Sequence, residues 1–247
     1  MKYFLIVLAS LFGLAVLYVL WYTVSALLVD GKREYESNSR YYRFLLDSAT
    51  AFWLWAIGVR IHVTGKEKLP KGRFLLVSNH RSNFDPIVTW RVFAHENLAF
   101  ISKEKNFHIP WFGRIIRRCA FMCIDRENPR NAIKTVNKAA RLIENDVVSV
   151  ALYPEGTRSK KLVLLPFHNG MFMIAQKSKA PVVVIAVQGT ELIQKKFPYR
   201  RSHVYIDVVD VIDAGTVAST KTDLIGERVR EDMERALSVD KVNTPKG

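Results

Sequence analysis

The chain carries, directly after an apolar run, the stretch Asn79-His80-Arg81-Ser82-Asn83-Phe84-Asp85-Pro86. The run before it, Phe74-Leu75-Leu76-Val77, has the length and composition of a buried β-strand. A loop at the end of such a strand can hold the side chains of His80 and Asp85 together. Neutral imidazole accepts a proton near neutral pH, and a carboxylate bonded to its other nitrogen fixes the tautomer and stabilises the imidazolium. The stretch therefore predicts either a proton-transfer pair or a loop histidine that a nearby carboxylate caps.

Length, composition and charge restrict the class of protein. The chain has 247 residues, 49% of them hydrophobic, which suffices for one sizeable domain with a core. The net charge of +14 indicates an anionic partner such as membrane lipid, nucleic acid or a phosphorylated substrate. The two cysteines, Cys119 and Cys123, have apolar neighbours and no second pair, which favours packing over a disulfide or a metal site. We therefore expect a reduced body that faces the cytosol.

The N-terminal segment has the composition of a membrane anchor. Residues Tyr3 to Val29 contain no charged side chain. As a helix they would cover about 40 Å, more than the roughly 30 Å of a bilayer's hydrocarbon core. The apolar stretch is too long for a cleaved signal peptide, whose apolar region has about 7–15 residues. Four cations between residues 32 and 43 follow the anchor, against a single Lys2 before it. The positive-inside rule therefore predicts a cytoplasmic body at the inner membrane.

A second apolar segment, Phe44 to Val59, combines Phe52, Trp53 and Trp55 with the charged Asp47. A helix lying in the membrane interface fits this mixture better than a second span, and both alternatives stay open. We expect three parts: a membrane-anchor helix over residues 1–30, an interfacial helical segment over residues 31–59, and the main domain over residues 60–247.

From residue 60 onward, apolar runs alternate with helical segments. The strand candidates are Arg60–Thr64, Phe74–Ser78, Leu98–Ser102, Ala120–Ile124, Val148–Tyr153, Val182–Val187 and Val204–Val211. A helix is predicted over Pro129 to Asn145, capped by Asn128, with an apolar stripe of Ile133, Val136, Ala140 and Ile143. Another is predicted over Thr222 to Leu237. This alternation is typical of an α/β domain.

A second polar stretch, Tyr153-Pro154-Glu155-Gly156-Thr157-Arg158-Ser159, also ends an apolar strand. Glycine allows the backbone to approach a ligand closely, and the planar guanidinium of Arg158 suits a phosphate. Thr157 adds a hydroxyl donor, and Glu155 is able to orient Arg158 or the loop itself. Taken alone, the stretch is equally compatible with an ordinary strand-to-helix turn that carries a solvated arginine.

Together, the two polar stretches resemble sequence blocks of the glycerolipid acyltransferase family, and specifically those of bacterial 1-acyl-sn-glycerol-3-phosphate acyltransferases. Segments Ile109–Gly113 and Phe121–Arg126 are similar to that family's second block, and Ala180–Val183 is similar to its fourth. Tyr153 stands where the family frequently has phenylalanine. The resemblance covers about residues 60 to 215.

The resemblance implies a single α/β domain with a mixed β-sheet flanked by helices, of the glycerol-3-phosphate acyltransferase type, in which residues 60–247 are the catalytic domain. It implies that the first and third blocks meet at one end of this domain. His80 would be the general base and Asp85 its orienting partner. The cations for the acceptor's phosphate would be Lys103, Arg126 and Arg158, in a pocket shaped by Glu155, Gly156 and Thr157.

The implied reaction transfers a fatty acyl group from acyl-CoA or acyl carrier protein (ACP) to the sn-2 hydroxyl of lysophosphatidic acid, giving phosphatidic acid. It requires no acyl-enzyme and no cofactor, and the scattered histidines lead us to expect no metal. Glycerol 3-phosphate and other lysophospholipids stay open as acceptors, because they also carry a phosphate. The expected membrane partner is anionic lipid, contacted by Arg40, Arg43, Lys103, Lys105, Arg114, Arg117 and Arg118.

A non-enzymatic alternative is a membrane-tethered basic module that binds anionic lipid or nucleic acid. It accounts for the charge but gives no reason for His80 and Asp85 to occur together with residues 155–159. We therefore expect an enzyme, with no nucleic-acid partner.

Overall fold

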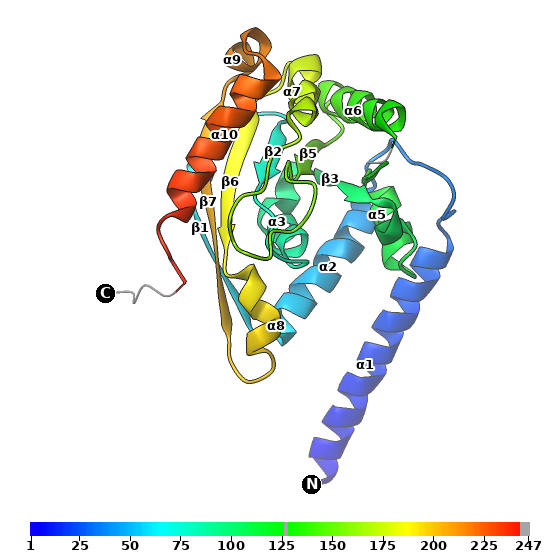
Figure 1. Cartoon of the computed structure of the whole chain (residues 1–247). Coiled ribbons are helices and arrows are strands. Elements are labelled where there is room, and N and C mark those ends of the chain that lie inside the picture. The colour runs from blue at the N-terminus through cyan, green and yellow to red at the C-terminus, as the bar shows by residue number, and fades with distance from the viewer. Residues whose placement is uncertain (126–127, 243–247) are drawn as a thin grey trace.

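Among residues 1–125 and 128–242, which the computed structural model describes, seven strands form one sheet in the order β1-β7-β6-β2-β5-β3-β4 (Figure 1). The strands are β1 (Val59–Thr64), β2 (Leu75–Ser78), β3 (Leu98–Lys103), β4 (Met122–Ile124), β5 (Ser149–Leu152), β6 (Val182–Gln188) and β7 (Ser202–Ile212). Strands β2 to β6 run parallel, whereas β7 pairs antiparallel with β6 and parallel with β1. Each predicted strand segment overlaps one of these strands, and the predicted mixed sheet is confirmed.

The central strands explain why apolar runs dominate this sequence. Strands β2, β5 and β6 are buried at every position, so both of their faces must be apolar. Because successive strand side chains point to opposite faces, Phe74 and Leu76 enter one core cluster while Leu75 and Val77 enter the other. The sheet is therefore the middle layer of three.

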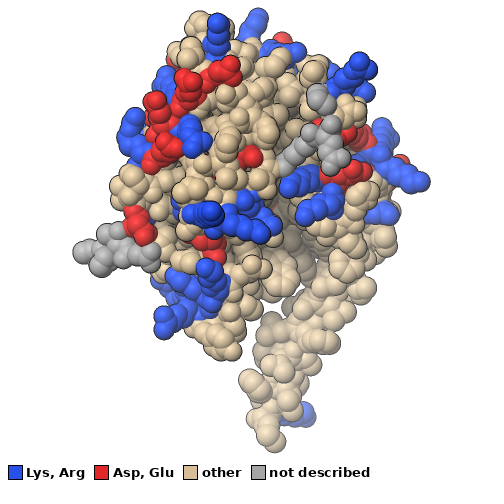
Figure 2. Space-filling model, viewed as in Figure 1, with Lys and Arg blue, Asp and Glu red and all other residues tan. Residues whose placement is uncertain are grey.

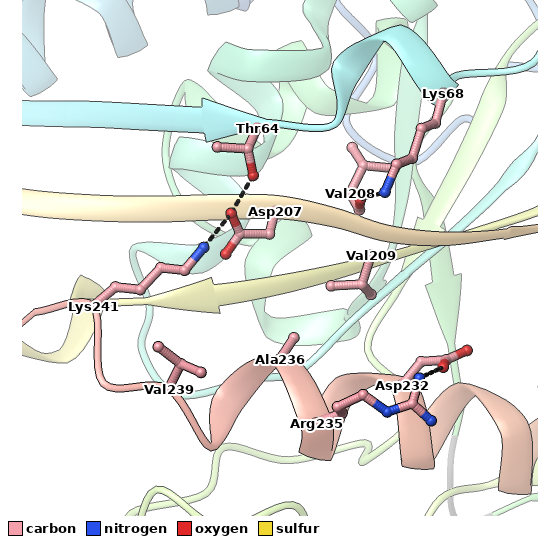
Figure 3. Close-up of a pocket in the computed structure, with 10 residues that line it drawn as sticks. All are labelled: Thr64, Lys68, Asp207, Val208, Val209, Asp232, Arg235, Ala236, Val239 and Lys241. Carbon is pink, nitrogen blue, oxygen red and sulfur yellow. Dashed lines mark hydrogen bonds and ion pairs between the residues drawn. The ribbon is translucent and has the colours of Figure 1, made fainter.

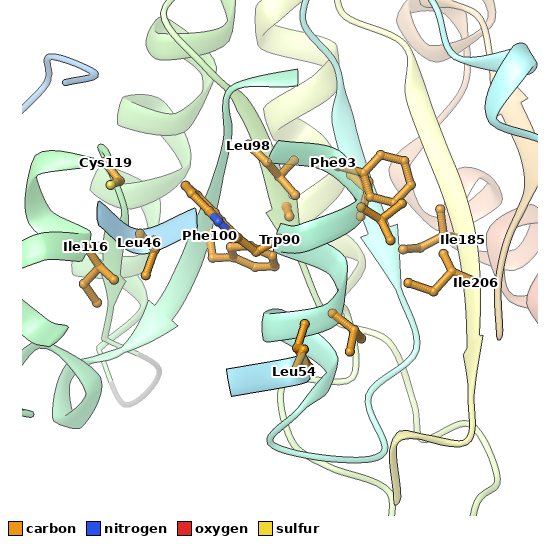
Figure 4. Packing of buried hydrophobic residues seen from close by; sticks show 14 of the residues in the cluster. Leu46, Leu54, Trp90, Phe93, Leu98, Phe100, Ile116, Cys119, Ile185 and Ile206 are labelled. Atoms are coloured by element: carbon orange, nitrogen blue, oxygen red, sulfur yellow. The ribbon is translucent and has the colours of Figure 1, made fainter. Parts of the chain in front are cut away.

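Helices α2 (Arg40–Ala56), α3 (Asp85–Phe93) and α5 (Phe112–Arg118) cover one face of the sheet. Figure 4 shows Trp90 and Phe93 of α3 packed between the sheet residue Ile185 on one side and Leu46 of α2 on the other. Cys119 packs in the same cluster, as its apolar neighbours predicted. Burial of each large apolar side chain contributes about 1.5–3 kcal/mol.

The opposite face is covered by α6 (Pro129–Glu144), α7 (Met173–Ser178), α9 (Ala214–Ser219) and α10 (Thr222–Leu237). The predicted cap of α6 is confirmed, because the Asn128 side chain accepts hydrogen bonds from the N–H groups of Arg130 and Asn131. The predicted apolar stripe is wrong at Ile133, which is exposed. The buried face centres on Val136 and Ala139, and Ile133 falls on its margin.

Shorter helices occupy the connections. They are α4 (Glu104–Phe107), α8 (Ile193–Lys196) and the 3-10 turns η1 (Lys66–Lys68), η2 (Ala94–Glu96), η3 (Asn169–Phe172) and η4 (Thr190–Leu192). The turn η4 and α8 follow β6 directly, so they lie at the same edge of the sheet as the carboxyl ends of its parallel neighbours.

The N-terminal helix α1 (Lys2–Leu27) projects away from the body (Figure 1). An 18-residue stretch of this helix has a mean hydropathy of 2.5, and among the described residues it is the one helix long and apolar enough to cross a membrane. Helix α2 follows it and has two different faces. Leu45, Leu46 and Leu54 are buried in the core, whereas Trp53 and Trp55 are exposed. The interfacial position of α2 and the division of the chain at residues 30 and 59 stay predictions.

Arg43 corrects the prediction of a membrane-facing basic surface, because its side chain is buried. The residue is only 7% exposed, and its Nη2 donates hydrogen bonds to the carbonyls of Asn97 (2.9 Å) and Leu98 (3.0 Å). The guanidinium carbon lies 5.0 Å from the centre of the Trp90 ring. Burial lowers the pKa of Arg43 to about 10. The sequence pattern missed this role because an arginine after an anchor ordinarily faces lipid headgroups.

Two further arginines of that predicted surface attach the N-terminal segment to the body. Arg114 donates to the carbonyl of Val29 (2.8 Å), just beyond the end of α1. The guanidinium of Arg118 lies 4.6 Å from the centre of the Tyr35 ring. These contacts occupy side chains that were expected to reach the bilayer.

Candidate active site

His80 and Asp85 meet where β2 passes into α3. His80 Nδ1 lies 2.7 Å from Asp85 Oδ2, as the five-residue spacing predicted. The same oxygen accepts the backbone N–H groups of Arg81 (2.6 Å) and Ser82 (2.7 Å). The other oxygen, Oδ1, accepts a hydrogen bond from the hydroxyl of Thr190. Asp85 is fully buried, so these four hydrogen-bond donors, rather than bulk water, stabilise its negative charge.

This arrangement fixes the tautomer of His80 when its ring is neutral. A carboxylate that accepts backbone N–H groups has no proton to donate, so Nδ1 must donate its hydrogen to Asp85. Nε2 is then the acceptor nitrogen, and it bonds to no side chain or backbone group among the described residues. The His80 side chain is 17% exposed. The ring is therefore held through one nitrogen and presents a lone pair at the other.

Tyr153 supports the imidazole from its flat side. The two rings stack with their centres 4.3 Å apart and an angle of 21° between their planes. Burial raises the pKa of the Tyr153 hydroxyl well above its ordinary value, so this ring stays neutral. Phe100 stacks on Tyr153 in turn, with ring centres 6.2 Å apart. The imidazole thus rests on a rigid aromatic support.

Glu155 joins the two polar stretches of the sequence. Its Oε1 accepts the backbone N–H of His80 (2.7 Å), and its Oε2 accepts that of Leu165 (2.9 Å). Ser159 donates its own N–H to the carbonyl of His80 (2.8 Å). Gly156 turns the chain at a positive φ of 68°, which an L side chain rarely adopts. Glu155 is buried and acts as a bracket between backbone segments, with both oxygens occupied.

Two of the three expected phosphate cations, Lys103 and Arg158, follow the carboxyl ends of parallel strands, and these ends share one edge of the sheet. Arg158 is exposed and makes no hydrogen bond or ion pair with any described residue, and its neighbour Thr157 is exposed as well. Lys103 is the last residue of β3, two strands away from β2, and is exposed. The predicted residue Arg126 lies outside the described residues. Figure 2 shows Lys and Arg side chains gathered across the middle of the side of the molecule that it views.

Two residues of this site were missed by the sequence analysis. Thr190, in the turn after β6, binds Asp85 but lies 105 positions away along the chain. Asn79 is buried and bonds twice to Val187 of β6: its amide nitrogen donates to the carbonyl (2.9 Å), and its oxygen accepts the N–H (2.8 Å). Asn79 was visible as a polar residue ending an apolar strand, whereas no local pattern marks Thr190.

A groove elsewhere in the molecule is separate from this site. Figure 3 shows it between β7 and α10, where Asp207 pairs with Lys241 (2.8 Å) beside Thr64. None of the predicted site residues lines this groove. Within the described part of the chain, no group of three or more His, Cys, Asp and Glu side chains is arranged to hold a metal ion.

Comparison with known proteins gives one family and one fold. The family model described as "Acyltransferase" matches residues 60–188. The 1-acyl-sn-glycerol-3-phosphate acyltransferase of Saccharomyces cerevisiae is 28% identical over 73% of this chain. The protein of the same name from Limnanthes douglasii is 33% identical over 63% of this chain. The chain spans 61% and 54% of the lengths of these two relatives.

A solved structure has the same fold over nearly the whole chain. The crystal structure of the 1-acyl-sn-glycerophosphate (LPA) acyltransferase PlsC from Thermotoga maritima superposes with a TM-score of 0.69. The match covers 93% of this chain and 91% of that one, at 23% sequence identity.

We expect Glu155→Gln to change how stability depends on pH. Burial raises the pKa of the Glu155 carboxyl above its ordinary value, although the N–H groups of Leu165 and His80 act against this. The pKa of Glu155 is higher in the folded state than in the unfolded state. The contribution of this carboxyl to the free energy of unfolding is therefore fully present below the unfolded-state pKa and is lost as pH rises through the folded-state pKa. The melting temperature of the wild type minus that of Glu155→Gln should therefore decrease as pH rises from about 4.

The matched control is Glu231→Gln, which replaces an exposed carboxyl on α10 and should leave the pH dependence of melting unchanged. If the difference in melting temperature between wild type and Glu155→Gln stays constant over the pH range, the raised pKa of Glu155 is contradicted.

Proposed function

The chain belongs to the acyltransferase family, and on this premise we propose that it transfers a fatty acyl group from an acyl thioester to the sn-2 hydroxyl of 1-acyl-sn-glycerol 3-phosphate (lysophosphatidic acid). The acceptor is supported by the names of the yeast and Limnanthes relatives. The observation that carries the proposal is the 2.7 Å contact between His80 Nδ1 and Asp85 Oδ2, which leaves Nε2 as an acceptor.

His80 acts as the general base in this proposal. Nε2 takes the proton of the sn-2 hydroxyl while that oxygen attacks the thioester carbonyl. When the tetrahedral intermediate collapses, the carbon–sulfur bond breaks, and the leaving thiolate takes the proton back from the imidazolium. A thioester is already activated, so no acyl-enzyme is needed. Asp85 stabilises the transient imidazolium through Nδ1, and Tyr153 keeps the ring plane fixed.

Arg158 binds the phosphate of the acceptor in this proposal. Its exposed guanidinium follows the Glu155 bracket and precedes Ser159, whose N–H is bonded to the carbonyl of His80. The bracket therefore ties the backbone around Arg158 to the backbone of the base. Guanidinium groups suit phosphate because their planar donors bind two oxygens at once. Lys103 and Arg126 stay further candidates for the same phosphate.

The lipid nature of the acceptor agrees with an anchored enzyme. Helix α1 supplies a segment long and apolar enough to span the membrane, and the cations after it favour a cytoplasmic body at the inner membrane. The acyl donor is acyl-CoA or acyl-ACP, since both are anionic and would be attracted by a chain of net charge +14. No cofactor enters the proposed reaction.

We expect His80→Ala to reduce kcat by at least about 10², because a positioned base contributes 10²–10⁴ in rate. The assay would use full-length protein in lipid, with lysophosphatidic acid as acceptor and acyl-CoA and acyl-ACP tested in parallel. The control is His95→Ala, an exposed histidine at the amino end of β3, which should match the wild type. Equal rates for wild type and His80→Ala would end the assignment of the base, and an inactive wild type would end the assignment of the acceptor.

For Arg158→Ala we expect KM for lysophosphatidic acid to rise about tenfold or more, since a charged hydrogen bond contributes about 1.5–3 kcal/mol. Monoacylglycerol, which has the acyl chain and a hydroxyl but no phosphate, should show no such change as a competing acceptor. Arg158→Lys should recover part of the loss because it restores the charge without the fork. An unchanged KM in Arg158→Ala would remove this residue from the phosphate site.

A further inference from the structure

A basic and aromatic segment covers the end of α8 and its connection to β7. Residues 195–201 read Lys-Lys-Phe-Pro-Tyr-Arg-Arg, and no acidic residue occurs between Glu191 and Asp207. Tyr199 is 91% exposed and Phe197 is 51% exposed. Figure 2 shows Lys and Arg side chains gathered at the lower end of the face, over α8 and this connection. Large aromatic side chains exposed to water beside clustered cations indicate an interaction surface for a protein or a membrane.

This segment lies against the carboxyl end of α2. The N–H of Ser202 donates to the carbonyl of Gly58 (3.2 Å), and Val59 is opposite Ser202 in the β1–β7 pair. A Cβ on Gly58 would lie 3.4 Å from Cγ of Arg201. The last two turns of α2 expose Phe52, Trp53 and Trp55, the last of them at 77%. Residues 195–201 and these three aromatics are called the basic–aromatic surface below.

The basic–aromatic surface lies at the same edge of the sheet as His80. Strands β2 and β6 are parallel, and their carboxyl ends lead to His80 and to α8 respectively. In Figure 1, α1 extends from the body toward this same lower end, past α8. A bilayer that contains α1 is therefore on the side where the basic–aromatic surface and the candidate active site are found.

We propose that the basic–aromatic surface contacts the headgroup region of an anionic lipid leaflet, as a second membrane contact beside α1. Tryptophan and tyrosine prefer the membrane–water interface, and each lysine or arginine close to an anionic leaflet contributes about 1 kcal/mol. An acidic protein such as a carrier of the acyl group would also meet the four cations. It would not account for Trp53 and Trp55, which are exposed near the carboxyl end of α2. The inference rests on α1 being in a bilayer and is independent of the proposed reaction.

The direct test is the depth of residue 199 in a bilayer. A spin label is placed at Tyr199→Cys in a full-length Cys123→Ser chain, whose remaining Cys119 is buried, and the protein is reconstituted in phosphatidylglycerol–phosphatidylcholine nanodiscs. Collisions with oxygen, which concentrates in the bilayer, are compared with collisions with a nickel chelate, which stays in water. A label at Lys221→Cys, which precedes α10 at the far end of the body, gives the reference value in water, and a label at Trp55→Cys reports on the α2 part of the same surface.

We expect the oxygen-to-nickel ratio at position 199 to be severalfold higher than at 221 and close to that at 55. Lys195→Glu with Arg200→Glu should lower the ratio at 199 in these anionic nanodiscs. The matched pair Lys71→Glu with Lys179→Glu precedes β2 and β6 at the opposite edge and should leave it unchanged. Equal ratios at 199 and 221 would overturn the proposal. So would a charge reversal that leaves the ratio at 199 intact, because these cations would then not hold the surface on the anionic leaflet.

Discussion

The carboxylate of Asp85 is the constraint on which the rest of the site depends. A fully buried charge is tolerated only when its oxygens are hydrogen-bonded, and Asp85 draws its donors from the loop after β2 and from Thr190 after β6. These bonds determine the path of the loop and the orientation of the His80 ring together. The hydrogen bonds that the buried Asp85 carboxylate requires therefore also fix the position of His80 Nε2, which faces away from it.

A second buried carboxylate repeats this solution on the other side of His80. Glu155 binds the backbone of residue 80 with one oxygen and that of Leu165 with the other, so the loop after β5 is attached to the loop after β2. The aromatic support from Tyr153 comes from the same loop. Base, bracket and proposed phosphate ligand are therefore parts of one connected structure rather than side chains on independent loops. Such connection is what keeps reacting groups aligned.

Local patterns in the sequence were sufficient for the strands and for the pairing of His80 with Asp85, whereas the mixed sheet was implied by the family resemblance. Buried strands must be apolar on both faces, and a pair five residues apart at a strand end needs only one loop to meet. Patterns of this kind did not reveal Thr190, because its contact depends on β6 lying beside β2. They also failed for Arg43, whose position after the anchor resembles that of a headgroup-binding arginine. Its actual partners are carbonyl groups more than fifty positions away. The basic–aromatic surface combines segments 140 residues apart and could be recognised only in the fold.

The central claim is that Nδ1 of the neutral His80 ring carries the hydrogen. Nitrogen-15 NMR of histidine-labelled protein measures this directly. The His80 signals are assigned by their loss in His80→Ala, with the pH chosen so that the ring is neutral. The account predicts that Nδ1 carries the hydrogen and Nε2 does not, and that Asp85→Ala abolishes this preference. A neutral His80 ring with its hydrogen on Nε2 would contradict the account, because that nitrogen could not then accept the proton of an attacking hydroxyl.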